Sequence, residues 1–144
     1  VWVGGAKKFV VNKETLKDAN IGYRWGFFDD EFLDLVEENV LDITVATHRL
    51  EKKSVDGPIM EQLGNKAEIS MVHFIGLIKK QSKGEDGILL ANRYTNVAYI
   101  KGKKGRRTVS CYWYRDCHCW SVRAGSVETP GPWSADSQLL SRDS

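Results

Sequence analysis

The amino-acid sequence predicts an α+β fold, in which helices from the N-terminal half pack on one face of an antiparallel sheet. About four or five strands are expected in this sheet, formed mainly by residues 88–143. In the first half, apolar residues recur at spacings of three and four, which is typical of helices. After Gly87 the chain changes to short runs rich in β-branched and aromatic residues, which are typical of strands. The length of 144 residues fits a single globular domain, residues 1–144.

Two short helices are predicted in the first third of the chain. Asn12 is placed to cap the first, over residues 13–19, because its side chain can accept a hydrogen bond from a free backbone amide. An aspartate at position 29 or 30 would cap the second, over residues 31–41. In this second segment an apolar stripe repeats every four residues and the acids lie on the opposite side. The stripe consists of Phe32, Val36 and Val40.

Two further helices are predicted before the strands begin. Pro58 favours the first turn of a short helix over residues 58–63, which Gly64 ends. Asn65 is then placed to cap the longest helix, over residues 66–82. Because this helix is apolar almost all round, we expect it to lie at the centre of the hydrophobic core.

Short strands are predicted at residues 9–11 and 41–45, and a meander of strands after residue 87. A three-residue turn ending at Gly105 would pair Val97 with Cys111 in the first hairpin. The segment before the last strand is interpreted as an ordered loop anchored by Trp133. The predicted strands of the second half are residues 88–90, 96–101, 106–113 and 118–124, followed by an edge strand at 138–142.

The segment CYWYRDCHCW holds all three cysteines of the chain and four aromatic rings. A hairpin turn at residues 115–116 pairs Cys111 with Trp120. Side chains alternate along a strand, so Cys111 would lie on the opposite face from Cys117 and Cys119. Three thiolates cannot then bind one metal ion, and the spacing C-x5-C-x-C differs from that of structural zinc sites. We therefore expect no metal and no cofactor.

Cysteine spacing and hydropathy set the expected compartment. Cys117 and Cys119 are separated by one residue, a spacing that does not easily form a disulfide within a strand. An odd number of cysteines also suits a reducing compartment better than an oxidising one. No apolar run is long enough to span a membrane. The sequence therefore predicts a soluble, cytoplasmic protein that has no membrane partner.

Charge is segregated along the chain, although the net charge is only +2. Residues 28–62 contain ten acids and three bases, whereas residues 98–124 contain seven bases and one acid. Such a pattern can simply keep a protein in solution, but a basic surface also attracts polyanions. Cations and rings on neighbouring strands could contact phosphates and stack on bases. The predicted nucleic-acid-binding residues are Lys101, Lys103, Lys104, Arg106, Arg107, Tyr112, Tyr114 and Arg115.

Three functions remain open from the sequence. The first is a non-enzymatic binding domain that meets an unidentified protein or nucleic acid through the open face of the sheet. This face carries Tyr112, Tyr114, Cys117, Cys119 and the flanking bases. The second is nucleic-acid binding through that basic, aromatic sheet. The third is a small hydrolase with His48 or His118 as the base, although no known catalytic motif is present. His73 lies among apolar neighbours, so we expect it to be a core residue.

Several segments carry a resemblance to a group of proteins. They are AEISMVHFIGLIKKQSKGEDG, NVAYIKG, CYWYRDCHCWSVRAGSV and SADSQLLSRDS. The chain resembles, over most of its length, small uncharacterised bacterial proteins from metagenome-derived genomes. This resemblance implies a bacterial origin, and it implies no activity, cofactor or partner.

Overall fold

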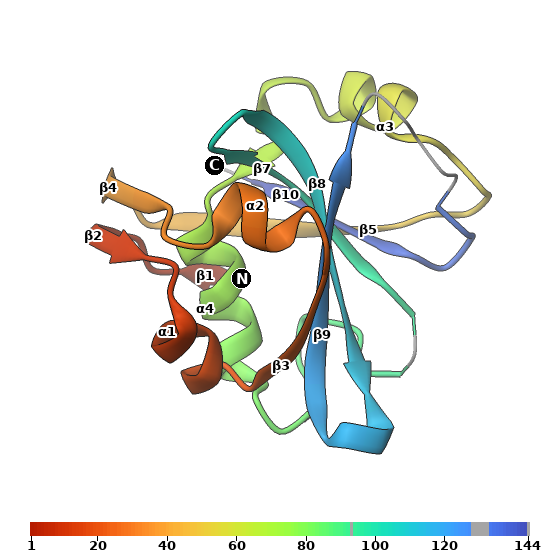
Figure 1. The fold of residues 1–144 in the computed structure, drawn as a ribbon. Coiled ribbons are helices and arrows are strands. Elements are labelled where there is room, and N and C mark those ends of the chain that lie inside the picture. Colours follow the sequence, from red (N-terminus) through yellow and green to blue (C-terminus); the bar gives the residue numbers. More distant parts are fainter. Residues whose placement is uncertain (93, 128–132, 144) are drawn as a thin grey trace.

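A large sheet of eight strands occupies the centre of the part of the molecule that the structure describes (Figure 1). The structure is a computed structural model and describes residues 1–92, 94–127 and 133–143. The strands are β1 (Trp2–Val3), β3 (Ile21–Gly26), β5 (Ile43–Arg49), β6 (Glu68–Ile69), β7 (Asn96–Gly102), β8 (Gly105–Tyr114), β9 (Cys119–Ser126) and β10 (Gln138–Arg142). Their order across the sheet is β1-β5-β10-β7-β8-β9-β3, and β6 also pairs with β7.

The sheet is mixed, whereas the sequence predicted a purely antiparallel sheet. Three pairs, β10 with β7, β3 with β9 and β6 with β7, are parallel, and the other pairs are antiparallel. Strands β1, β3, β5 and β6 come from the first half of the chain. The prediction of four or five strands from residues 88–143 was therefore wrong, because extended segments of the first half add to both sides of the meander.

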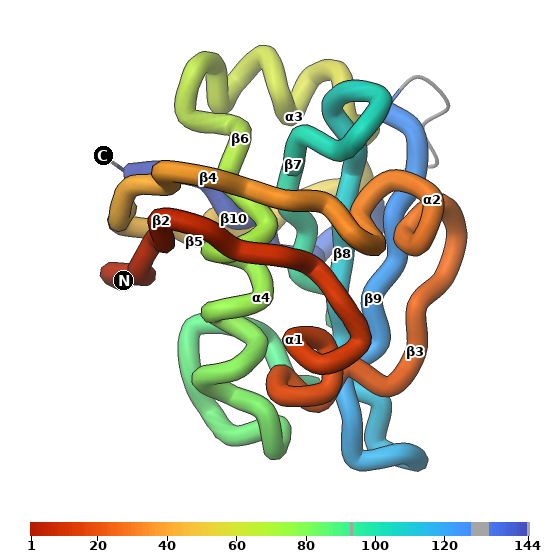
Figure 2. Tube along the Cα trace, turned by 60° about the vertical axis from the view of Figure 1, so that its left-hand side comes forward, coloured from red at the N-terminus to blue at the C-terminus, as the bar shows by residue number. Residues whose placement is uncertain are grey.

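Helices and a second, smaller sheet cover the large sheet. They are α1 (Lys13–Asp18), α2 (Phe28–Phe32), α3 (Asp56–Leu63) and α4 (Met71–Lys80), with a two-stranded sheet of β2 (Ala6–Val10) and β4 (Val36–Val40). Figure 1 shows α1, α2 and α4 on one side of the β8–β9 pair, and in Figure 2 β2 and β4 lie side by side over α4. Helix α3 packs on the other face, through Ile59 against Val97, Tyr99 and Leu139. The prediction of helices on one face was therefore wrong for α3.

Helix α4 lies in the core, as predicted. Seven of its ten residues are buried, and they contact β1, β4 and β7 among other elements. The helix begins at Met71 and not at Lys66, because the preceding residues form a 3-10 turn (Gly64–Lys66) and then β6. Its first amides are bound from outside the helix: Met71 and Val72 each donate a hydrogen bond of 2.8 Å to the carboxylate of Glu37.

Residues 31–41 do not form the predicted helix. Helix α2 ends at Phe32, and Asp34 takes the left-handed backbone conformation with φ of 69°. The chain then extends as β4, and Val36, which the helical stripe would have buried, is 45% exposed. The four-residue spacing of apolar residues is therefore coincidental here. Two other predicted helices are confirmed in α1, where Asn12 caps the first turn, and in α3.

The first hairpin has a shorter turn than predicted. Gly102 faces Gly105 across a two-residue turn, so Asn96 faces Cys111 in place of Val97. Glu31 of α2 holds this turn, because its carboxylate accepts a hydrogen bond of 2.9 Å from the amide of Lys104. The sequence prediction does not include this contact, since it places the acids of this segment on the solvent side of a helix.

The second hairpin has a longer turn than predicted. A 3-10 turn (Arg115–Cys117) and His118 lie between β8 and β9, so Cys111 faces Val122 and Trp113 faces Trp120. The register differs from the predicted one by two residues. Because side chains alternate with a period of two, the predicted faces of these strands are confirmed, with Cys111 in the core.

The C-terminal strand has an internal position in the sheet. Residues 138–142 form β10 between β5 and β7, not an edge strand as predicted. Residues 88–90 form no strand; the buried Leu89 instead donates its amide to Gln81, at 2.9 Å. Trp133 is an anchor, as predicted, whereas residues 128–132 of the predicted loop lie outside the described residues. Among the residues that the structure describes, none of the helices has the length and hydropathy needed to span a bilayer.

Candidate ligand-binding face

The predicted nucleic-acid-binding residues are spread along the length of β8. Lys103 and Lys104 form the tip of the first hairpin, and Lys101 lies beside them on β7. Eight residues separate Lys104 from Tyr112, which corresponds to about 26 Å at ~3.3 Å per residue of strand. Arg115 lies at the opposite end of the strand, in the 3-10 turn. The structure therefore does not bring the lysines of the tip together with the tyrosines.

Two of the predicted cations already have acidic partners. Arg106 forms a half-exposed ion pair of 3.0 Å with Glu68, and Arg107 donates to the carboxylate of Glu31 at 3.1 Å. Burial of Glu31 disfavours its charged form. The amide of Lys104 and the guanidinium of Arg107 outweigh this effect, so the pKa of the Glu31 carboxyl is held below its ordinary value. The guanidinium of Arg107 therefore serves to join β8 to α2 through Glu31.

Four aromatic rings form a continuous row on the part of the sheet that α3 does not cover. The centroids of Tyr112 and Tyr114 on β8 are 6.1 Å apart, and Tyr114 lies 5.6 Å from Tyr23 of β3. Tyr23 in turn lies 5.8 Å from Trp25, with the two rings nearly parallel. Tyr23 and Trp25 are 43% and 49% exposed. Exposed apolar patches of this kind mark interaction surfaces in proteins.

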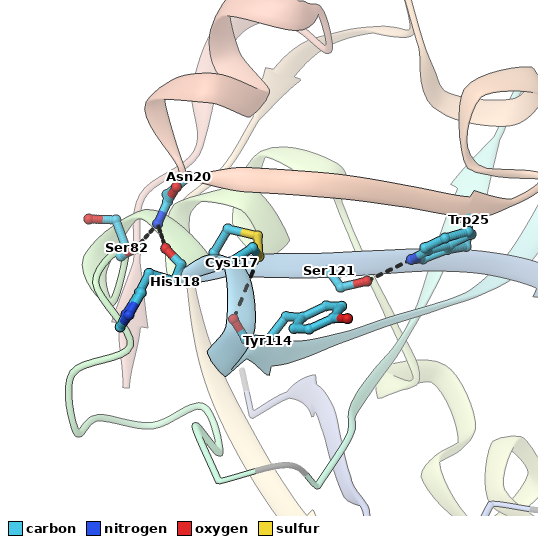
Figure 3. Close-up of a disulfide and its surroundings, with 8 residues drawn as sticks. Asn20, Trp25, Ser82, Tyr114, Cys117, His118 and Ser121 are labelled. Atoms are coloured by element: carbon cyan, nitrogen blue, oxygen red, sulfur yellow. Dashed lines mark hydrogen bonds between the residues drawn. A yellow bond between two sulfur atoms is a disulfide. The ribbon is translucent and has the colours of Figure 1, made fainter.

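The pairing of β3 with β9 determines where the rings of Tyr23 and Trp25 lie in this row. An irregularity in the register between Ile21 and Tyr23 sets Tyr23 opposite Ser121 and Trp25 opposite Arg123. The indole nitrogen of Trp25 donates a hydrogen bond of 2.9 Å to the hydroxyl of Ser121 (Figure 3). This bond fixes the orientation of the indole, so the face is preorganised without a ligand.

A hollow of about 460 Å³ adjoins the Trp25 end of the row. A second hollow of about 310 Å³ includes Trp25 itself and shares Ser110, Arg123 and Trp133 with the first. Small-molecule sites in proteins have volumes of about 300 to 1,000 Å³ and combine apolar walls with a few polar groups. The first hollow has this composition, with Phe27, Asp56, Thr108, Ser110, Arg123 and Trp133 in its lining.

Arg123 is the cation of both hollows. Its side chain is exposed, and no hydrogen-bond or ion-pair partner of its guanidinium is found among the described residues. The stem of Arg123 lies against Gly26, where an added Cβ would come within 3.5 Å of its Cγ and would also collide with the carbonyl of Ala124. Gly26 has a φ of 66°, a backbone conformation that favours glycine. Its backbone lines the first hollow beside Arg123.

A buried carboxylate forms part of the larger hollow. Asp56, 2% exposed, accepts hydrogen bonds of 2.8 Å from the Tyr99 hydroxyl, 2.7 Å from the Trp133 indole and 3.1 Å from the Thr108 hydroxyl. Burial, and then the bond to Asp56, raise the pKa of Tyr99 far above its ordinary value. Asp56 therefore joins α3 to the sheet and holds Trp133 as a wall of the hollow.

The cysteines contradict one sequence prediction. Cys117 and Cys119 form a disulfide, with Cα atoms 5.2 Å apart. The expectation against this bond assumed an extended strand, whereas His118 takes the left-handed conformation with φ of 51°, so the two side chains meet. Cys111 is a buried free thiol on the other face, and burial raises its pKa. Within the described ranges, no group of three or more His, Cys, Asp or Glu residues could hold a metal ion.

Among the residues that the structure describes, no histidine lies beside an accessible nucleophile. The ring of His118 points away from the disulfide (Figure 3). His48 lies 3.0 Å from the hydroxyl of Ser141, but Ser141 is 2% exposed and a substrate could not reach it without separation of β5 and β10. His73 is the predicted core residue: one ring nitrogen accepts from the amide of Ser70, and the other contacts the carbonyl of Leu41 at 2.8 Å.

The sequence analysis did not find the β3 half of this face. The sequence predicts no strand over residues 21–26, and Arg123 is not among its predicted binding residues. The alternation of Tyr23, Trp25 and Phe27 was the available signal, since alternating exposed rings are typical of a strand with one solvent face. The parallel pairing of β3 with β9 depends on contacts distant in the sequence, which alternation alone does not reveal.

No family model, curated protein or solved structure matches this chain.

Proposed function

We propose that the protein is a non-enzymatic binding domain, and that its ligand is a small organic anion with a planar ring. The ligand would occupy the hollow beside Trp25 and Trp133, with its negative group on Arg123. The observation that carries this proposal is the position of Arg123 in a hollow of ligand size, next to a row of exposed rings. The guanidinium of Arg123 has no partner among the described residues.

Charge and geometry support this class of ligand. Guanidinium groups bind carboxylate, sulfonate and phosphate groups through two parallel hydrogen bonds. The exposed rings beside Arg123 offer aromatic faces and edges to a planar ligand. The hydroxyl of Ser110 adds a neutral hydrogen-bonding group in the lining, whereas the Thr108 hydroxyl already donates to Asp56. The carboxylate in that lining, Asp56, already accepts three hydrogen bonds, and the proposal places the negative group of the ligand on Arg123 and not beside Asp56.

The first test uses anilinonaphthalene sulfonate, a planar aromatic anion whose fluorescence rises when it leaves water. We expect the native protein to bind it, and Arg123→Met to weaken binding by about 10- to 100-fold, since a hydrogen bond to a charged group contributes ~1.5–3 kcal/mol. Arg115→Met is the matched control, because Arg115 is exposed on the same part of the molecule but does not line either hollow.

Equal affinities of the two arginine variants would contradict the proposal. A neutral ring compound of the same size gives a second readout. Arg123→Met should reduce the preference of the protein for the anion over this neutral compound, while Trp25→Ala should weaken both. Circular dichroism of each variant shows whether the fold is retained, so that a loss of binding is not confused with unfolding.

A second candidate function is binding of single-stranded nucleic acid along the ring row. The observation in its favour is the continuity of the row, with Arg115 directly after Tyr114 in the chain and Arg123 opposite Trp25 at the end of the row. Bases stack on aromatic side chains in such binders, and binding weakens with salt. We expect Tyr114→Ala to weaken binding of a fluorescent oligothymidylate, whereas Lys103→Ala with Lys104→Ala, at the distant tip, should change it less. The reverse order would favour the basic hairpin as the contact surface.

We also propose a cytoplasmic location. The buried free thiol of Cys111 supports it, because unpaired cysteines are more common in reducing compartments, whereas the Cys117–Cys119 disulfide counts against it, because disulfides are rare there. Fractionation of the host cell, with detection of the native protein, tests this location, and recovery outside the cytoplasm would contradict it.

A further inference from the structure

The Cys117–Cys119 disulfide closes a ring of three residues at the turn between β8 and β9. A cross-link over so short a segment constrains the unfolded chain little, so its contribution to stability through chain entropy is small. Cys117 is partly exposed, whereas Cys119 is 5% exposed and packs against Gly22 of β3. The two sulfur atoms thus differ in their access to solvent.

Hydrogen bonds that do not involve sulfur hold the same turn. The side chain of Asn20 donates to the carbonyls of His118, at 2.8 Å, and Ser82 (Figure 3), while the carbonyl of Asn20 accepts from the amide of Trp120 at 2.9 Å. The amide of His118 bonds to Arg115 at 3.2 Å. The turn therefore keeps its backbone supports whether or not the sulfur atoms are joined.

The surroundings also suit the reduced state. Sγ of Cys117 lies 3.6 Å from the carbonyl oxygen of Tyr114 (Figure 3), which can accept a weak hydrogen bond from the thiol once it is reduced. Cys119 pairs across the hairpin with Tyr114 through the backbone, so it stays in position after the bond is broken. Both oxidation states are compatible with the described contacts.

We propose that Cys117 and Cys119 form a thiol–disulfide exchange site, and that Cys117 is the sulfur attacked by an external low-molecular-weight thiol such as glutathione. This inference does not depend on the ligand proposed for the ring face.

The reaction is balanced in two steps. A thiolate attacks Sγ of Cys117, a new S–S bond forms to the external thiol, and Cys119 leaves as a thiolate that takes a proton from water. A second external thiolate then attacks the sulfur of the first external molecule and releases Cys117 as a thiolate, which is also protonated. The net change is oxidation of two external thiols to one disulfide and reduction of the protein pair, and it is reversible.

The test exposes the native wild-type protein to a series of glutathione redox buffers. Each sample is quenched with an alkylating agent and digested, and the state of each cysteine is read by mass spectrometry. We expect the pair to pass from disulfide to dithiol, with the mixed disulfide on Cys117, alkylation of Cys119 in the same molecules, and Cys111 unmodified. A pair that stays oxidised until denaturant is added, or a mixed disulfide on Cys119, would overturn the proposal.

Two variants give a matched comparison. In Cys119→Ser the remaining thiol of the pair is the partly exposed Cys117, and in Cys117→Ser it is the buried Cys119, while the buried Cys111 is present in both. With glutathione disulfide, the first variant should form the mixed disulfide about 10- to 100-fold faster, because access controls the reaction of a thiol. Equal rates in two folded variants would contradict the proposal. If either variant does not fold, as judged by circular dichroism, the wild-type measurement decides alone.

Discussion

The guanidinium of Arg107 on β8 donates a hydrogen bond of 3.1 Å to the carboxylate of Glu31 on α2, across 76 residues of sequence. The same carboxylate accepts the amide of Lys104 at the hairpin tip, and the carbonyl of Glu31 accepts the amide of Lys103. A close approach at Gly102, where an added Cβ would lie 2.6 Å from the Glu31 carboxylate, completes the contact. Glu31 thus fixes the end of the β7–β8 hairpin to the helical layer.

Replacement of Glu31 by Gln is expected to destabilise the protein by about 2–4 kcal/mol, because it leaves the charge of Arg107 without its buried partner. Chemical denaturation, followed by circular dichroism, measures the change in the free energy of unfolding. Glu68→Gln is the control, since it removes the more exposed pair with Arg106 and should cost less than about 1 kcal/mol. A loss for Glu31→Gln no larger than for the control would show that the buried pair does not stabilise the fold.

Lowering the pH should remove the stabilisation that Glu31 provides. The pKa of Glu31 is lower in the folded protein than its ordinary value of 4.5, so the unfolded chain binds the proton more readily. The contribution of Glu31 is therefore fully present above that value and is lost as the pH falls through the folded-state pKa. Denaturation across a pH series that brackets this range should show a steeper decline in wild type than in Glu31→Gln. Parallel curves would exclude Glu31 as a source of the decline.

Removal of the Asp56 carboxylate is expected to affect both stability and the hollow. Asp56→Ala leaves the donors of Tyr99, Thr108 and Trp133 unpaired, and we expect a loss of about 2–4 kcal/mol. Asp56→Asn keeps one acceptor oxygen and should lose less. Denaturation gives the energies, and the NMR signal of the Trp133 indole proton reports its hydrogen bond. An unchanged indole signal in folded Asp56→Ala would contradict the assigned contact.

Gly22 provides a test of the packing beside the disulfide. An added Cβ would lie 2.5 Å from Sγ of Cys119, so Gly22→Ala should displace β3 from the turn and destabilise the protein by about 1–3 kcal/mol. Gly57 of α3 is the matched control, because a Cβ added there would meet no atom within 4 Å. Gly57→Ala should leave stability unchanged or raise it by up to about 1 kcal/mol. Thermal unfolding of both variants measures the difference.

Local signals in the sequence were sufficient for several elements. The cap at Asn12, the stop at Gly64 and the apolar centre of α4 all depend on neighbouring residues, and the structure confirms them. The faces of β8 and β9 were also predicted correctly, because alternation survives a register shift of two residues.

Contacts between distant segments limited the rest of the prediction. Glu37 binds the start of α4 and Glu31 binds the hairpin turn, so acids that look like the surface of one helix support two other elements. The predicted cations were identified by charge alone, and the sequence does not show that Arg107 is paired whereas Arg123 lies in a hollow. Half of the ring row depends on the parallel β3–β9 pair, which joins segments about a hundred residues apart.

The internal position of β10 has a consequence for how the chain folds. His48 on β5 meets Ser141 on β10 across 93 residues, and β10 also pairs with β7. The halves of the sheet on either side of β10 can be bridged only after residues 138–142 have been synthesised. Until then, β5 and the Asn96–Val97 end of β7 present unpaired edges that can associate with other chains. Because such distant pairings dominate the sheet, we expect slow folding, and a nascent chain that is at risk of aggregation until β10 has been made.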